Sequence, residues 1–227
     1  PALSSAASDV YKRQIQGIET ASKNAADGQS LIDTLETSLS EVQSILLRMR
    51  ELTIQAISDT NSAADRLALD TELSQLELEI TRIGSTTSFG GKPVFDGNLH
   101  YLQIGPRSGN TLEVQAYTLS ASTLGLTQDL TTRNNAENYL GIIDTAIEDI
   151  NEKRGAAGAL SNRLDFIMSN LDNSRVNLIK SRSIIEDADF AAESVKLAKA
   201  KILEQVAIAM IAQANARTQW ILKLLEN

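Results

Sequence analysis

The one histidine of this 227-residue chain, His100, is the first side chain that could act as a general base. A Ser-His-Asp hydrolase needs its serine on a sharp strand-to-helix turn, and no such nucleophile-elbow motif accompanies His100. The residue also falls in a segment predicted to be a strand, where a surface or edge histidine is the more common role. We therefore expect that His100 is not catalytic.

Two groups of carboxylates have the chemistry to bind a cation or to exchange protons. Glu186, Asp187 and Asp189 lack the loop spacing and the glycine of an EF-hand, so helix capping is the simpler interpretation. Glu77 and Glu79 lie two residues apart on a predicted helix, so they face different sides and are interpreted as solvated surface. The chain has no cysteine, which excludes thiolate catalysis and thiolate metal sites. The sequence thus predicts no enzyme, no cofactor and no metal site.

A third candidate site is a charged cluster at Arg48, Arg50, Glu51 and Leu52, within an otherwise apolar segment. One interpretation is a solvated helix face with pairing along the helix. The other is a protein-binding patch, because arginine beside an exposed leucine is typical of interface hot spots. The residues alone leave both interpretations open.

Composition narrows the classes of partner. The formal net charge is −8 and the basic residues are dispersed, which argues against binding to nucleic acid or to anionic lipid. No stretch reaches about 18 apolar residues, so we expect no membrane insertion. Residues 1–14 lack a basic start followed by an apolar run, so we expect no Sec-type signal peptide. An aromatic content of 4% and three prolines favour long helices over a β-sandwich.

Heptad spacing predicts long helices in the first part of the chain. A helix over residues 15–58 carries apolar or small residues at alternating steps of three and four, namely Ile32, Leu35, Leu39, Val42, Leu46, Met49, Thr53 and Ala56. Polar residues 59–62 break it, with Asn61 or Ser62 as the N-cap of a second helix over residues 63–83. The short connection predicts that the two helices are antiparallel neighbours.

The middle of the chain, residues 84–132, is predicted to form a small β region. Turn residues dominate positions 89–97, and two predicted strands at 99–104 and 111–117 form a β-hairpin that caps one end of the helical bundle. The glycines here match neither a P-loop nor a dinucleotide fingerprint, so a turn is the natural interpretation.

The last part of the chain predicts a third helix over residues 135–181 and a fourth over 183–227. A capping-box pattern beginning at Ser183 marks the expected break between them. The fourth helix has no obvious partner within the chain, so its apolar face is a predicted interface with other chains. Its candidate self-assembly residues are Val195, Ile202, Val206, Met210, Trp220, Leu224 and Leu225. The predicted fold is mainly α: an elongated bundle of heptad-patterned helices with a small β-hairpin region and a C-terminal coiled-coil-forming helix.

Several motifs in a fixed order give the chain a close resemblance to bacterial flagellin, from about residue 15 to the end. In the N-terminal half they are SKNAADG (22–28), LRMRELTIQA (47–56) and FGGKPVF (89–95). In the C-terminal half they are NRLD (162–165), SRSIIEDADFA (181–191) and AQAN (212–215).

The resemblance implies a rod domain over residues 15–182 and an inner-core helix over residues 183–227. It implies non-covalent polymerisation into the flagellar filament outside the cell, after passage through the flagellar export apparatus with an export chaperone. The outer variable domains of the family would fall near residues 127–134, where this chain has only a short connection, as in a minimal flagellin. That connection also leaves no room for an inserted enzyme domain.

Residues 1–14 depart from the family pattern. They have weak periodicity, and we interpret them as a disordered or foreign junction. They stand where the family has its N-terminal inner-core helix, so the C-terminal helix is expected to lack its coiled-coil partner.

The resemblance also implies recognition by the innate immune Toll-like receptor 5. The matching residues are Arg48, Leu52 and Glu72, flanked by Arg50, Glu51 and Gln55. The alternative function with the same helical plan is the hook–filament junction protein, which we rank second because it should not carry the 186–189 and 212–215 runs together.

Overall fold

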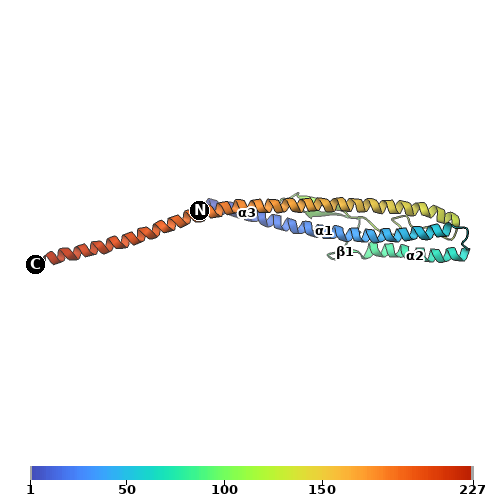
Figure 1. The fold of residues 1–227 in the computed structure, drawn as a ribbon, viewed down its shortest axis with the longest axis horizontal. Coiled ribbons are helices and arrows are strands. Elements are labelled where there is room, and N and C mark those ends of the chain that lie inside the picture. The colour runs from blue at the N-terminus through green and yellow to red at the C-terminus, as the bar shows by residue number, and fades with distance from the viewer. Residues whose placement is uncertain (1, 226–227) are drawn as a thin grey trace. The chain divides into compact units, whose positions relative to one another are not determined.

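The computed structural model describes the backbone of residues 2–225, and the side chains of residues 8–185, 190–191 and 193–217 (Figure 1). The described chain forms three helices and two small antiparallel hairpins. It divides into two compact units, one made of residues 17–174 and the other of residues 1–16 with 175–227. Each unit is described by itself below.

Helix α1 (Ala2–Ile57) begins well before the predicted start at residue 15. The expectation that residues 1–14 are disordered is therefore wrong from Ala2 onward. Residues 2–16 contain neither glycine nor proline, so nothing in them interrupts a helix once it has formed. Ile15, near the end of this stretch, is buried.

The predicted apolar stripe of α1 is confirmed and forms the centre of the core. Its members are buried from residue 32 to residue 56, and they are Ile32, Leu35, Leu39, Val42, Leu46, Met49, Thr53 and Ala56. Thr53 is tolerated there because its hydroxyl donates to the carbonyl oxygen of Met49 at 2.7 Å. Burial of this stripe on folding is the main stabilising contribution of α1, since helix propensity alone is weak.

Helix α2 (Ala63–Thr86) begins at the predicted N-cap Ser62. The backbone N–H of Ser62 donates to Asp65 Oδ2 at 2.9 Å, and Asp65 N–H donates back to Ser62 Oγ at 3.2 Å. These two bonds make a capping box. The Ser62 hydroxyl, which donates to Asp65 Oδ2 at 2.7 Å, and then the Ser62 backbone N–H lower the pKa of Asp65, because they favour its charged form. Figure 1 shows α2 alongside α1, as the short connection between them predicts.

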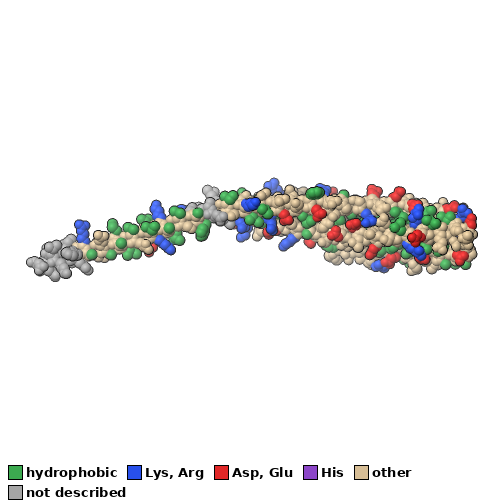
Figure 2. All heavy atoms as spheres, in the orientation of Figure 1, with side chains coloured by type: hydrophobic (Ala, Val, Ile, Leu, Met, Phe, Trp, Pro, Cys, Tyr) green, Lys and Arg blue, Asp and Glu red, His purple; other side chains and the backbone are tan. Residues whose placement is uncertain are grey.

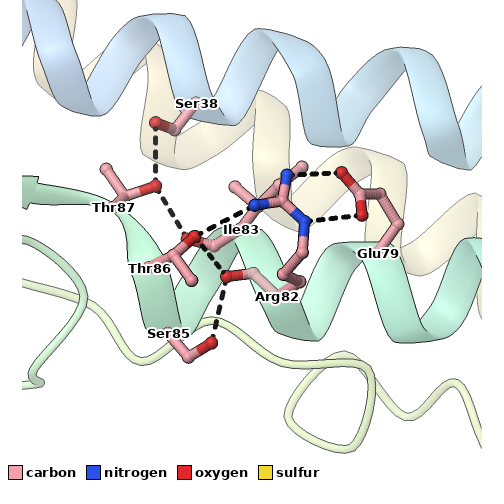
Figure 3. A network of polar contacts seen from close by, with 7 residues as sticks. All are labelled: Ser38, Glu79, Arg82, Ile83, Ser85, Thr86 and Thr87. Carbon is pink, nitrogen blue, oxygen red and sulfur yellow. Dashed lines mark hydrogen bonds and ion pairs between the residues drawn. The ribbon is translucent and has the colours of Figure 1, made fainter.

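Helix α2 ends three residues beyond the predicted Ile83, and hydroxyl side chains bond to carbonyl groups of its last turns (Figure 3). Thr86 Oγ1 donates to the carbonyl of Arg82 at 2.8 Å, and Thr87 Oγ1 donates to that of Ile83 at 2.7 Å. Ser38 of α1 lies 3.4 Å from the Thr87 hydroxyl, which ties this end of α2 to α1. The exposed Arg82 side chain pairs with Glu79 on the same helix at 2.6 Å.

The predicted β-hairpin is confirmed as β3 (Leu99–Gln103) and β4 (Thr111–Gln115), paired antiparallel with Tyr101 opposite Glu113. A smaller hairpin, β1 (Ser88–Phe89) with β2 (Lys92–Pro93), precedes it. Its turn uses Gly90 and Gly91, both at positive φ, which favours glycine. The β4 side chains alternate, so that Leu112 and Val114 enter the core.

The β3–β4 hairpin and the segment around it pack closely on the helices at two glycines. A Cβ at Gly28 of α1 would lie 2.4 Å from a methyl carbon of Leu102, and one at Gly84 of α2 would lie 1.9 Å from the Leu119 carbonyl oxygen. Asn24 of α1 also donates to the carbonyl of Gln103 at 2.9 Å. The β region is thereby seated on the helices, and its register with α1 is set by these contacts.

Helix α3 (Arg133–Leu225) is continuous, so the break predicted at Ser183 is wrong. Residues 159–225 contain neither glycine nor proline, and a capping-box pattern without such a residue does not end a helix. The helix begins two residues before the predicted Asn135. Asp129 accepts hydrogen bonds from the Thr131 backbone at 2.9 Å and from the Asn135 side chain at 2.8 Å, which stabilises that start.

Candidate recognition and assembly surfaces

The charged cluster predicted on α1 connects α1 to α2. Arg48 Nη2 and Nε donate to Glu72 Oε1 at 2.7 and 2.9 Å, and Arg48 Nη1 donates to Glu51 at 3.1 Å. The hydrogen bonds that Arg48 donates to Glu72, and then to Glu51, raise the pKa of Arg48 above its ordinary value. Two of the three residues implied by the family resemblance, Arg48 and Glu72, are therefore in direct contact and exposed.

Arg50 lies on the other side of α1 and pairs with α3. Its Nε donates to Asp144 Oδ1 at 2.7 Å, which raises the pKa of Arg50. The two arginines are two residues apart, so they leave α1 in different directions and contact different helices. The cluster therefore has a structural role, because its arginines pair with Glu72 of α2 and Asp144 of α3 as well as with Glu51 on α1.

Interpretation of this cluster as a protein-binding patch required an exposed leucine beside the arginines, and Leu52 is not exposed. It is 1% exposed and belongs to the hydrophobic core. The reason is its place three residues after Met49, which puts it on the buried side of α1. The exposed apolar residues of this segment are instead Leu47 and Ile54, while Glu51 and Gln55 are exposed as polar neighbours.

His100 lies on β3, as predicted, and its Nε2 is 3.2 Å from Asp96 Oδ1. The pKa of Asp96 is lowered mainly by hydrogen bonds from Asn98, with a smaller contribution from His100. This contact connects β3 to the turn before it. It is a local structural interaction between a half-buried histidine and a half-buried carboxylate.

Glu77 was interpreted as solvated surface, and the structure corrects this. The fully buried Tyr139 of α3 donates its hydroxyl to Glu77 Oε1 at 2.5 Å. Burial raises the pKa of Glu77, as does the negative charge of Asp70, although the Tyr139 hydrogen bond opposes them. Glu77 lies four residues after the buried Leu73, and that spacing is the signal that could have placed it on the inner side of α2.

The C-terminal part of α3 exposes its predicted self-assembly residues. Val195 is 69% exposed, Ile202 60%, Val206 52% and Met210 65%. Every side chain from residue 193 to residue 217 is exposed, and Figure 2 shows hydrophobic side chains on the surface of this segment. The remaining predicted residues, Trp220, Leu224 and Leu225, lie outside the side chains that the structure describes.

The described residues offer neither a metal site nor a membrane span. Within them, no three side chains of His, Asp or Glu gather closely enough to hold a metal ion. None of the described helices has a stretch that is apolar enough to cross a membrane.

Family models match both ends of the chain. The bacterial flagellin N-terminal helical region matches residues 2–100, and the bacterial flagellin C-terminal helical region matches residues 140–225. A flagellin of Halalkalibacterium halodurans is 39% identical over 225 residues, covering 97% of this chain and 83% of that protein. A flagellin of Bacillus subtilis is 34% identical over 258 residues, covering 97% of this chain and 84% of that protein.

Solved structures give the same picture of the fold. The crystal structure of Bacillus cereus flagellin has a TM-score of 0.61 at 35% identity, covering 66% of this chain and 88% of that one. A putative flagellar hook-associated protein from Vibrio parahaemolyticus has a TM-score of 0.71 at 15% identity, covering 81% of this chain and 97% of that one. At that identity the second likeness concerns the fold alone.

Burial of the Glu77 carboxyl makes the stability of the helical bundle depend on pH. The pKa of Glu77 is raised in the folded chain, so its contribution is fully present below the unfolded pKa and is lost as pH rises through the folded pKa. The quantity compared is the free energy of unfolding of the unchanged chain minus that of Glu77→Gln. We expect this difference to increase as the pH falls from about 7 to about 4. Urea unfolding at a series of pH values measures this difference.

Glu79→Gln is the matched control, because Arg82 lowers the pKa of Glu79 two residues away on the same helix. The same difference for Glu79→Gln should decrease as the pH falls over that range, since a carboxylate with a lowered pKa stabilises the folded chain until acid protonates it. Equal pH dependence of the two variants would contradict the assignment of Glu77 to a buried contact.

Proposed function

The chain belongs to the bacterial flagellin family, and we propose that the exposed C-terminal part of α3 polymerises it non-covalently into the flagellar filament. As a flagellin it is a structural subunit of that filament, which lies outside the cell. The filament serves motility as the propeller of the cell.

The observation that carries the proposal is the exposure of large apolar side chains on α3. Val195, Ile202, Val206 and Met210 are each at least half exposed. Fully burying one such side chain stabilises by about 1.5–3 kcal/mol, so four of them in each copy strongly favour association. Leu197, Ile208 and Ile211 are exposed as well and lie on another side of the helix, so more than one neighbouring helix is needed to cover it.

Export through the flagellar apparatus with the help of an export chaperone is the proposed route to the filament. The chain has no cysteine, so no disulfide stands in the way of passage as an unfolded polypeptide. The unpartnered apolar face of α3 is the part of the chain that most needs a chaperone before assembly.

Free subunits are also proposed ligands of Toll-like receptor 5. Arg48, Glu51, Gln55 and Glu72 form an exposed patch across α1 and α2, and Arg50 lies on the other side of α1 beside Asp144 of α3. Leu52 is buried, so its proposed role is to hold α1 in place beneath the patch. Because the same surface is proposed to lie between subunits in the filament, recognition requires free monomer.

The hook–filament junction protein is the second candidate. The likeness to a putative hook-associated protein supports a shared fold, at 15% identity. Identity of 39% over 225 residues to a flagellin favours the filament subunit. The sequence runs at residues 186–189 and 212–215 also favour the filament subunit, because the junction protein should not carry both of them.

Polymerisation is tested by replacing two of the exposed apolar residues of α3. We expect the unchanged chain to form filaments that sediment and are visible by electron microscopy, and Ile202→Ser/Val206→Ser to lose most of the sedimenting fraction. Gln205→Ser, at an exposed polar position between them, should polymerise like the unchanged chain. Because all three positions are exposed in the free chain, circular dichroism should be the same for each variant. Filaments from the double variant at normal yield would overturn the proposal.

Receptor recognition is tested with purified monomer on cells that report Toll-like receptor 5 signalling. Arg48→Ala and Glu72→Ala each remove a partner from the patch, and we expect each to need about tenfold more protein for the same signal, or about 1.4 kcal/mol of binding. Asp27→Ala, an exposed carboxylate of α1 outside the patch, is the control. Unchanged signalling by both patch variants would end the hypothesis.

A further inference from the structure

The sulfur of this chain is carried by three methionines, because cysteine is absent. Their surroundings differ. Met49 is fully buried in the core of the residue 17–174 unit, and Met168 is half-buried against the same core. Met210, on the C-terminal part of α3, is 65% exposed. Of the three thioether groups, the one at Met210 is therefore the one that solvent reaches freely when the chain is a free subunit.

Met210 lies on the same side of α3 as other residues proposed for self-assembly. Ile202, Val206 and Met210 follow one another at steps of four, so each side chain lies about one turn beyond the last. Ile202 and Val206 are exposed apolar residues, as Met210 is. The methionine that solvent reaches in the free chain is thus also one that a neighbouring helix covers in the proposed filament contact.

Hydrogen peroxide oxidises an accessible thioether directly. A lone pair of Met210 Sδ attacks one peroxide oxygen, and an S–O bond forms as the O–O bond breaks. The departing hydroxide takes the proton of the transferred oxygen and leaves as water. Sulfur loses two electrons, the peroxide is reduced, and the product is methionine sulfoxide. The reaction requires an accessible sulfur, which Met210 provides and Met49 does not.

We propose that Met210 is an oxidation site that controls the entry of free subunits into the filament, with peroxide as the oxidant. The inference rests on the proposed function, because Met210 must be covered by neighbouring copies. The sulfoxide is polar, and burying its oxygen in an apolar contact without a hydrogen-bond donor is unfavourable. Oxidised subunits are excluded from the filament, whereas assembled subunits hold Met210 away from the oxidant. Methionine sulfoxide reductases reverse the change, with one enzyme for each sulfoxide epimer.

Peptide mass spectrometry measures which methionines gain oxygen. Free chain and polymer from one preparation are treated with hydrogen peroxide, and the added oxygen is followed at each methionine over time. In the free chain we expect Met210 to oxidise at least about tenfold faster than Met49, which is the internal reference. In the polymer Met210 should oxidise at least about tenfold more slowly than in the free chain. Equal rates at Met210 in free chain and in sound filaments would overturn the proposal.

Polymerisation of the oxidised chain measures the consequence. We expect peroxide-treated free chain to give at least about fivefold less sedimenting polymer, and treatment with both methionine sulfoxide reductases and dithiothreitol to restore it. Met210→Leu keeps an apolar side chain without sulfur, so it should polymerise normally before and after peroxide. Met168→Leu is the matched control, since leucine for methionine is a small change of volume, and it should stay as sensitive as the unchanged chain.

The possible results separate the oxidation site from the proposed function. Normal polymer from chain fully oxidised at Met210, or equal peroxide sensitivity of Met210→Leu and the unchanged chain, would overturn the oxidation site and leave the filament function intact. Loss of helical circular dichroism in the treated chain would also overturn it, since polymer would then be lost through unfolding. Absence of polymer from the untreated, unchanged chain would overturn both.

Discussion

Burial of a single stripe on α1 is the constraint on which the rest of the 17–174 unit depends. The residues between Ile32 and Ala56 on this stripe are almost completely inaccessible, and they belong to one core with Leu73 and Ile80 of α2, Val114 of β4 and Ile143 of α3. Because α1 contributes more buried residues to this core than any other element, its heptad spacing determines where the other elements can pack. Polar contacts then choose among the arrangements that the apolar packing permits.

Those polar contacts join helices more than they stabilise any one helix. Arg48 reaches Glu72 on α2, Arg50 reaches Asp144 on α3, and Tyr139 of α3 reaches Glu77 on α2. The exposed pairs contribute little free energy, but the buried Tyr139 hydroxyl would be costly without its acceptor. The proposed receptor patch is therefore built on the same residues that hold α1 and α2 in register.

Sequence reasoning predicted the local features whose signals are strong, such as the Ser62 cap, the hairpin after residue 98 and the α1 stripe. It failed where a signal was absent or ambiguous. Ser183 begins a capping-box pattern, but no glycine or proline accompanies it, and α3 continues through it. Glu77 was assigned to the solvated surface together with Glu79, although its spacing of four from Leu73 turns it toward Tyr139 of α3. A groove lined by Ile104 and Phe166 depends on contact between segments far apart in the chain, which periodicity does not report.

The 17–174 unit buries the main apolar stripe of α1 within itself, whereas residues 193–217 of α3 leave their apolar side chains for other copies. Hydrogen–deuterium exchange of backbone amides in free chain and in polymer, read by mass spectrometry, tests it most directly. An uncovered helix opens readily, so amides of residues 193–217 should exchange fast in the free chain and at least about a hundredfold more slowly in the polymer. Amides of residues 32–56 should be slow in both. Equal exchange of residues 193–217 in the two states would contradict the account.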